Sequence, residues 1–290
     1  MSDRPAAITA SLPADMSNPP FDMSNSVSGA GGGVVIVPMN ELLQPPHPPT
    51  ATGKYPIVVG GHFPDLGWDP ALRAQVVLAE FAATDWQGQL DPGPPDDTPA
   101  SLLDEITSMI SPPMLLQRSR RLAEIIAQAE DATLYWTDML MLTVSARPWT
   151  CCLIAIGQTV GQLVAMHFKY KYMRARPVQV YPAIMPPVTT PRHPSYPNSH
   201  ALQGYLMSLG VATACPALRD PLMALADRVS ENRVIAGLHF PSDTTTSARL
   251  AQNILPILGA GVEFQKVLAG AAAELQGLST YPPQRSNAPA

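Results

Sequence analysis

Cysteine is scarce in this chain of 290 residues, which contains three, and charged side chains make up only 14% of it. Two of the cysteines, Cys151 and Cys152, are adjacent in an apolar run, so no disulfide framework is indicated and a reducing compartment is expected. The net charge is −5 and no long basic run occurs, which argues against nucleic acid and anionic membranes as partners. The first residues also lack the charged-then-apolar pattern of an export signal. Together these absences predict a cytoplasmic protein.

A clean membrane-spanning run is lacking as well. The best candidate, residues 150–168, contains Gln158, Gln162 and His167, and it falls short of the roughly 20 apolar residues that a span requires. Hydrophobic residues nevertheless make up 46% of the chain, a share typical of a thick helical core or an extensive subunit interface. The sequence therefore predicts a soluble homo-oligomer with no membrane partner.

Residues that favour turns and loops, by contrast, are concentrated near the N-terminus. Residues 1–65 are rich in Pro, Gly, Ser and Asn, and such a stretch cannot bury enough apolar surface to offset its ordering entropy. It is predicted to be either a tail or an arm whose apolar residues 34–38 reach a neighbouring subunit, and both alternatives stay open. Residues 279–290 are predicted to be a second tail, which leaves residues 66–278 as a single helical domain.

Apolar residues recur every three to four positions through this domain, which is the spacing of amphipathic helices. No alternation typical of strands occurs outside residues 34–38, so the fold is predicted to be all-α. Six prolines make residues 178–197 a rigid extended loop, and Pro256 and Gly259 weaken the last helix. The predicted helices span residues 70–86, 101–110, 114–142, 150–174, 199–213, 217–236 and 242–275.

The first group of chemically notable residues lies at the end of the most apolar helix. Lys169 and Arg176 are seven residues apart, or two helical turns, so they project from the same face. Pro177 ends the helix directly after Arg176, which lets that guanidinium turn into a cavity. Lys171 and Arg174 lie on other faces and are predicted to be solvent-facing or structural.

The second group surrounds a predicted helix start. Asn198 is a good N-cap residue, and Ser199 and His200 open the helix that follows it. The first N–H groups of a helix have no partners inside the helix and carry partial positive charge, which makes them an anion site. For this block taken alone, a capping or core histidine is the preferred interpretation of His200.

The third group joins two further helices. Arg233 lies on a helix that Gly237 ends, His239 lies in the connector, and Asp243 falls in the first turn of the next helix. Four residues after His239, the carboxylate can accept the imidazole N–H and leave the other ring nitrogen free. An Asp cap beside an unrelated histidine explains this block nearly as well when it is taken alone.

Taken in order, the three blocks read K-x6-R-P, P-x-x-H and R-x5-H-x3-D. This pattern resembles the superfamily of type 2 phosphatidic-acid phosphatases, bacterial class A acid phosphatases and vanadium-dependent haloperoxidases, over roughly residues 150–250. The family pattern usually has P-S-G-H where this chain has Pro197-Asn198-Ser199-His200. It usually has Ser-Arg where this chain has Asn232-Arg233.

The resemblance implies a helical bundle that encloses a phosphate or vanadate pocket, and it implies a role for each residue. His239 would be the apical ligand of vanadium or the nucleophile that accepts a phosphoryl group. His200 would be the acid–base residue, and Asp243 would orient His239. The equatorial oxygens would be bound by Lys169, Arg176, Asn198, Ser199 and Arg233.

Two branches of the superfamily compete as the closer resemblance. The loop HPSYP, with His193 as a second pocket histidine, favours a vanadate-dependent haloperoxidase that oxidises a halide, bromide by preference, with hydrogen peroxide. The short spacing of 39 residues between His200 and His239, together with HFPSD, favours an acid phosphatase that uses a phosphohistidine and no cofactor. The haloperoxidase is the preferred prediction and the phosphatase its alternative.

Two further alternatives come from other classes. The change at Asn198 and Ser199 is compatible with a non-catalytic member that binds phosphate. A divalent-metal site built from His193, His200, His239 and Asp243 ranks last, because the neighbouring Lys and Arg side chains would repel a cation.

Overall fold

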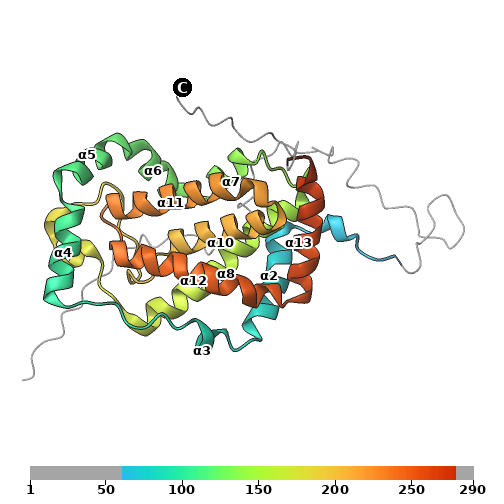
Figure 1. Cartoon of the computed structure of the whole chain (residues 1–290), viewed down its shortest axis with the longest axis horizontal. Helices are drawn as coiled ribbons and strands as arrows, with labels where there is room; N and C mark the ends of the chain where they lie inside the picture. Colours follow the sequence, from blue (N-terminus) through green and yellow to red (C-terminus); the bar gives the residue numbers. More distant parts are fainter. Residues whose placement is uncertain (1–60, 279–290) are drawn as a thin grey trace, which may run out of the picture. The chain divides into compact units, whose positions relative to one another are not determined.

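The computed structural model describes residues 61–278, and this part of the chain is all-α, as predicted (Figure 1). Residues 1–60 of the predicted N-terminal segment 1–65, and all of the predicted tail 279–290, lie outside the described residues. Short 3-10 helices occur at Asp65–Gly67, Pro182–Ile184, Pro216–Leu218 and Gln276–Leu278. The α-helices are α2 (Pro70–Ala82), α3 (Trp86–Leu90), α4 (Pro99–Met109), α5 (Pro112–Arg120), α6 (Leu122–Asp131), α7 (Leu134–Met139), α8 (Pro148–Tyr172), α9 (Pro177–Val180), α10 (Ser199–Ala214), α11 (Arg219–Ile235), α12 (Pro241–Gly259) and α13 (Val262–Leu275).

Helices α8 and α10 form the centre of the bundle. Helix α10 packs against α8, α11 and α12, and α8 also packs against α2 and α13 (Figure 1). Nearly every residue of α10 from Ala201 to Ala212 is buried, because neighbouring helices surround it on several sides. The start of α10 and the end of α8, which carry the predicted site residues, are therefore fixed by the core of the protein.

The close approach of α8 to α10 depends on glycine. A Cβ atom added to Gly157 would lie 2.7 Å from the backbone nitrogen of Met207 and 2.9 Å from its Cα. At Gly161, a Cβ would lie 2.9 Å from the Cγ of Gln203. Because the atoms facing Gly157 belong to a buried helix backbone, they have little freedom to move away.

We expect Gly157→Ala to lower the free energy of unfolding by about 1–3 kcal/mol, since the added methyl group overpacks the helix contact. The matched control is Gly210→Ala, where the nearest atom is the Cδ2 of Leu153 at 4.0 Å. There the higher helix propensity of alanine should raise stability by up to about 1 kcal/mol. Urea denaturation of both variants measures the difference, and equal effects would contradict this account of the contact.

The prediction of one helix over residues 114–142 is wrong, because the structure has three helices there. Helix α5 ends at Arg120, because the next residue, Arg121, has a φ of −103° and a ψ of 10° that depart from helical values. Helix α6 ends before a turn. In that turn the Asp131 carboxylate accepts the N–H of Thr133 at 2.8 Å. The breaks allow α7 to place Trp136 in the core, where its Nε1 donates to Ser208 at 2.9 Å. The apolar spacing continues across both breaks, so periodicity could not reveal them.

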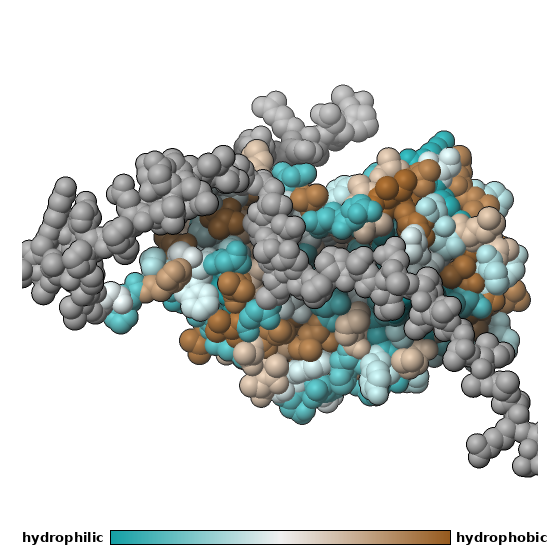
Figure 2. Space-filling view, turned by 180° about the vertical axis from the view of Figure 1, so that it is seen from behind, coloured by the Kyte–Doolittle hydropathy of each residue, from teal (hydrophilic) through white to brown (hydrophobic). Residues whose placement is uncertain are grey.

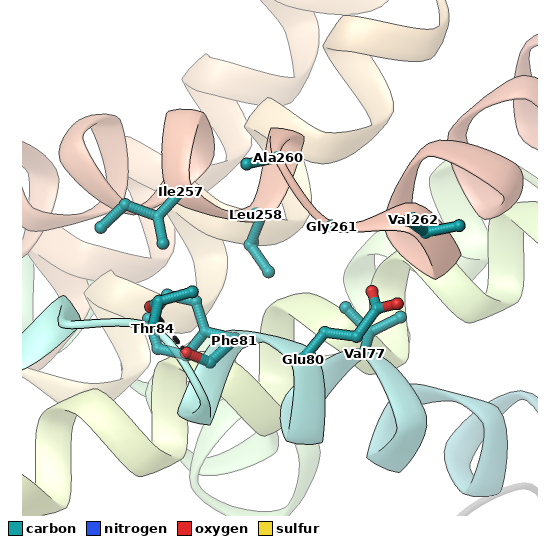
Figure 3. A pocket seen from close by; sticks show the side chains of 9 residues that line it. All are labelled: Val77, Glu80, Phe81, Thr84, Ile257, Leu258, Ala260, Gly261 and Val262. Carbon is teal, nitrogen blue, oxygen red and sulfur yellow. Dashed lines mark hydrogen bonds between the residues drawn. The ribbon is translucent and has the colours of Figure 1, made fainter.

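The prediction of one helix over residues 242–275 is also wrong. Helices α12 and α13 meet at an angle of 101°, and Pro256 lies within α12 rather than at the corner. Both carboxylate oxygens of Glu80 accept the N–H of Glu263 at 3.0 Å, which caps the start of α13. Figure 3 shows the side chains of a mainly apolar pocket of about 270 Å³ between α2 and this corner.

One stretch of the described residues, 148–180, is long and apolar enough to cross a membrane by length and composition alone, and the bent pair of α12 and α13 would be a second. Within the first stretch, 61% of the most apolar window is buried by other parts of the chain, as in a core helix. Where grey atoms do not cover the face in Figure 2, hydrophilic residues interrupt the apolar ones. Solubility, assembly and location remain predictions.

Candidate active site

The centre of the site is a buried pair formed by His239 and Asp243. His239 lies in the connector between α11 and α12 and is 2% exposed, while Asp243 in the first turn of α12 is fully buried. The Nδ1 of His239 lies 3.2 Å from the Oδ2 of Asp243. The carboxylate therefore accepts a hydrogen bond from Nδ1–H, which leaves Nε2 of the neutral ring with its lone pair.

Asp243 is held by three further donors. Its Oδ1 accepts Nη1 of Arg174 at 2.6 Å, and its Oδ2 accepts the hydroxyl of Ser195 at 2.5 Å and the N–H of Phe240 at 3.0 Å. Arg174 is 3% exposed, stacks on the Phe240 ring and also bonds Asp97 and Glu105. The structural alternative for Arg174 is thus confirmed. Ser195 was not identified from the sequence as a site residue, although it lies in the same HPSYP loop from which His193 was identified.

Arg176 lies directly behind His239. Its Nη1 donates to the Leu238 carbonyl at 2.8 Å and lies 3.4 Å from Nε2 of His239, and its Nε donates to the His193 carbonyl at 2.8 Å. Its Nη2 is 3.0 Å from Nδ1 of His193. Burial lowers the pKa of Arg176 to about 10, so the guanidinium remains charged near neutrality.

Lys169 contacts the proline-rich loop. Its Nζ donates to the carbonyls of Pro194, Ser195 and Pro197 at 2.7, 2.8 and 2.6 Å, so all three N–H bonds are used. Burial, reinforced by Arg176, lowers the pKa of Lys169 well below its ordinary value. Through its three hydrogen bonds, this ammonium group holds the proline-rich loop in place beside the site.

The start of α10 is built as predicted from its N-cap. The Oδ1 of Asn198 accepts the N–H of Ala201 at 3.3 Å, and its Nδ2 donates to the Thr244 hydroxyl at 3.0 Å. Ser199 is 6% exposed, and its hydroxyl has no hydrogen-bond partner among the described residues. His200 follows it on the same turn.

Arg233 reaches the site from α11 and is 1% exposed. Its Nη2 donates to the Ile125 carbonyl at 3.0 Å and to Oε1 of Gln128 at 3.3 Å, while its buried Nε has no partner among the described residues. Burial lowers the pKa of Arg233 to about 10. Gln128 on α6 was missed by sequence reasoning, because nothing in its local pattern marks it as a partner of α11.

These elements enclose a cavity of about 140 Å³. It is well below the roughly 300–1,000 Å³ of pockets for drug-sized ligands, so it suits a group of a few heavy atoms. Of the nine predicted site residues, four do not line the cavity: Lys169, Arg176, Asn198 and Asp243. The predicted residues that line the cavity are His193, Ser199, His200, Arg233 and His239.

All three histidines of the cavity favour their neutral form. Desolvation lowers the pKa of His193 to about 4, with Lys169 and Arg176 adding to the effect, and lowers that of His200 to about 3, with Arg233 adding to it. Desolvation also lowers the pKa of His239 well below 6.5. Burial and the neighbouring cations thus disfavour positive charge on these histidines, as expected at an anion site.

We expect the free energy of unfolding to fall as the pH drops from about 6.5 towards 4, because unfolded histidines take up protons that the folded site refuses. Above pH 6.5 the histidines are neutral in both states and contribute nothing. Asp91 and Glu124, whose pKa values are lowered to about 2, add a loss of stability only below about pH 5, and they do so equally in the wild type and the variant. Denaturation of the wild type and His200→Asn between pH 7.5 and 4.5 should give a shallower slope for the variant; parallel slopes would contradict the assignment.

A cation does not fit the same cavity. Among residues 61–278, no group of three or more His, Cys, Asp or Glu side chains is arranged to hold a metal ion. The divalent-metal alternative therefore has no ligand set in the described part of the chain.

Comparisons with known proteins include a sequence match to a curated enzyme. No family model matches the chain. A non-specific acid phosphatase of Providencia stuartii is 28% identical over 125 residues, which cover 42% of this chain and 50% of that protein. The chain therefore spans about half the length of this curated relative.

Among solved structures, the first transmembrane PAP2 type phosphatidylglycerolphosphate phosphatase from Bacillus subtilis aligns with 66% of this chain and 94% of its own. The TM-score is 0.31 and the identity 15%, values too low to support an argument. It is the sequence match to an acid phosphatase, together with the all-α fold, that supports the type 2 phosphatidic-acid phosphatase superfamily as the family that this chain resembles.

Proposed function

We propose that this protein hydrolyses phosphate monoesters in the manner of an acid phosphatase, by transferring the phosphoryl group first to His239 and then to water. One observation carries the proposal. A small cavity is lined by His239, whose Nε2 is free of Asp243, and by Ser199 and Arg233, each of which has a buried donor without a partner among the described residues. A phosphate group has the size and the acceptor oxygens to complete those hydrogen bonds.

The first step forms a bond between Nε2 of His239 and phosphorus while the bond to the ester oxygen breaks. A lowered pKa keeps the Nε2 lone pair available, and Asp243 stabilises the positive charge that the ring acquires. His200, beside it in the lining, would give its proton to the departing alkoxide. Its pKa of about 3 rises when a phosphate dianion offsets the neighbouring cations, so substrate binding itself would load this acid.

The second step reverses these roles. His200, now neutral, removes a proton from water as the water oxygen attacks phosphorus, and the bond between phosphorus and Nε2 breaks to release phosphate. Arg233 and the start of α10 would stabilise the charge on the equatorial oxygens throughout. Arg176, 3.4 Å from Nε2, adds positive potential at the point where the phosphoryl group is transferred.

Vanadate-dependent halide oxidation is the second candidate, and the position of His193 in the cavity lining favours it. Vanadate is tetrahedral like phosphate and would be held by His239 and the same donors. When bound, it would supply peroxide activation. The acid phosphatase relative favours hydrolysis over this alternative.

Parallel assays of one preparation separate the candidates. The proposal expects hydrolysis of p-nitrophenyl phosphate that orthovanadate inhibits competitively, and no halogenation with bromide and hydrogen peroxide after incubation with orthovanadate. Halogenation without hydrolysis would overturn the proposal in favour of the second candidate. Phosphate binding with neither activity would indicate the non-catalytic member.

A further inference from the structure

We propose that the hydroxyl of Ser199, and not the amide of Asn198, is the side chain that donates a hydrogen bond to the bound phosphate at the start of α10. The inference rests on the proposed phosphate site and assigns one of its ligands. It concerns the two positions at which this chain departs from the P-S-G-H pattern.

Asn198 is fully committed to the protein. Its side chain is 0% exposed, with Oδ1 accepting the N–H of Ala201 and Nδ2 donating to Thr244 on α12. Its backbone carbonyl accepts the Ser247 hydroxyl at 2.9 Å. Turning this amide towards the cavity would break both the helix cap and the link to α12, and Asn198 is not part of the cavity lining.

Ser199 has the opposite surroundings. It lines the cavity beside His200 and His239, and its hydroxyl is buried without a partner among the described residues. Buried hydroxyl groups in folded proteins nearly always have a hydrogen-bond partner. A ligand oxygen in the cavity is the acceptor that this hydroxyl lacks.

A second lining residue also has an unpaired donor, which supports the assignment independently. The Nε of Arg233, on α11, is also buried and without a partner among residues 61–278. A tetrahedral oxyanion has enough oxygens to accept a hydrogen bond from both donors, which lie on different helices. The hydroxyl of Ser199 would then act beside the N–H groups at the start of α10, which have no partners within the helix.

The test measures the Kd of inorganic phosphate by calorimetry and kcat/KM for p-nitrophenyl phosphate in Ser199→Ala. Loss of a hydrogen bond to a charged group should weaken phosphate binding about tenfold or more. Ser230→Ala is the matched control, because its hydroxyl on α11 is equally buried and unpaired but lies outside the cavity lining. It should leave the Kd within about twofold of the wild type. Ser199→Gly replaces Ser199→Ala if thermal unfolding shows that the alanine variant is not folded.

The outcomes separate this inference from the proposed function. A Ser199 variant that binds phosphate as the wild type does would overturn the ligand assignment while leaving hydrolysis in place. A wild type that binds phosphate without turnover would refute the proposed function, and the variants would still decide the role of Ser199. A wild type that binds no phosphate at about millimolar concentration would overturn both.

Discussion

His239→Ala is expected to lower kcat/KM for p-nitrophenyl phosphate by about 10⁴-fold or more, because the variant has no nitrogen to accept the phosphoryl group. The fold should survive, since Asp243 keeps Arg174, Ser195 and the N–H of Phe240 as donors. Phosphate binding should also persist, because Arg233 and the start of α10 remain. The loss should therefore appear in kcat rather than in affinity.

Two measurements make this expectation specific to His239. Labelled substrate, quenched after a brief incubation, should leave an acid-labile, base-stable phosphoryl group on the wild type and none on the variant. His62→Ala, which removes an exposed histidine, is the matched control and should keep full activity. Activity in His239→Ala above about a tenth of the wild type would place the nucleophile elsewhere.

Asp243→Asn is expected to have the second largest effect, on stability as well as on activity. The carboxylate accepts hydrogen bonds from four donors, and an amide must turn its NH2 group towards one of them. Arg174 keeps Asp97 and Glu105 but loses its fully buried counter-charge, which should cost about 1–3 kcal/mol of unfolding free energy. Activity should fall by about 10³–10⁴-fold, because the tautomer of His239 is no longer fixed.

The control for Asp243→Asn is another partner of the same arginine. Asp97 lies 2.8 Å from Nε of Arg174 but its side chain is 43% exposed, so Asp97→Asn should cost no more than about 1 kcal/mol. Urea denaturation and the phosphatase assay should be run on both variants. Equal losses would show that the buried position of Asp243 has no special importance.

The local features of the site could be predicted from the sequence because they depend on short spacing. His239 and Asp243 are four residues apart across a helix start, and their contact follows from that geometry. Asn198 is a good N-cap residue, and the structure begins α10 directly after it. The all-α fold followed from apolar periodicity in the same way.

The features that were missed depend on contacts between distant segments. The bond between Ser195 and Asp243 spans 48 residues, and that between Gln128 and Arg233 spans 105. The helix breaks within residues 114–142 leave the apolar spacing intact, so they are set by what each short helix packs against. The prediction that Lys169 and Arg176 project from one helix face is wrong, because α8 ends at Tyr172 and Arg176 lies just before α9. Neither residue is part of the cavity lining that both were expected to form.

Because three carbonyls surround the Lys169 ammonium group, arginine should not be able to replace lysine at this position, although it has the same charge. An ammonium group directs its hydrogens to the corners of a tetrahedron, which suits the three carbonyl oxygens of one loop. A guanidinium is planar, and the arginine side chain is longer. Arginine would keep the charge but would lose the hydrogen bonds to the loop of residues 194–197, whose Ser195 donates to Asp243. At residue 169 the shape of the side chain therefore matters more than its charge. Loss of the lysine would displace the loop that carries Ser195, and so would disturb Asp243 and the nucleophile His239.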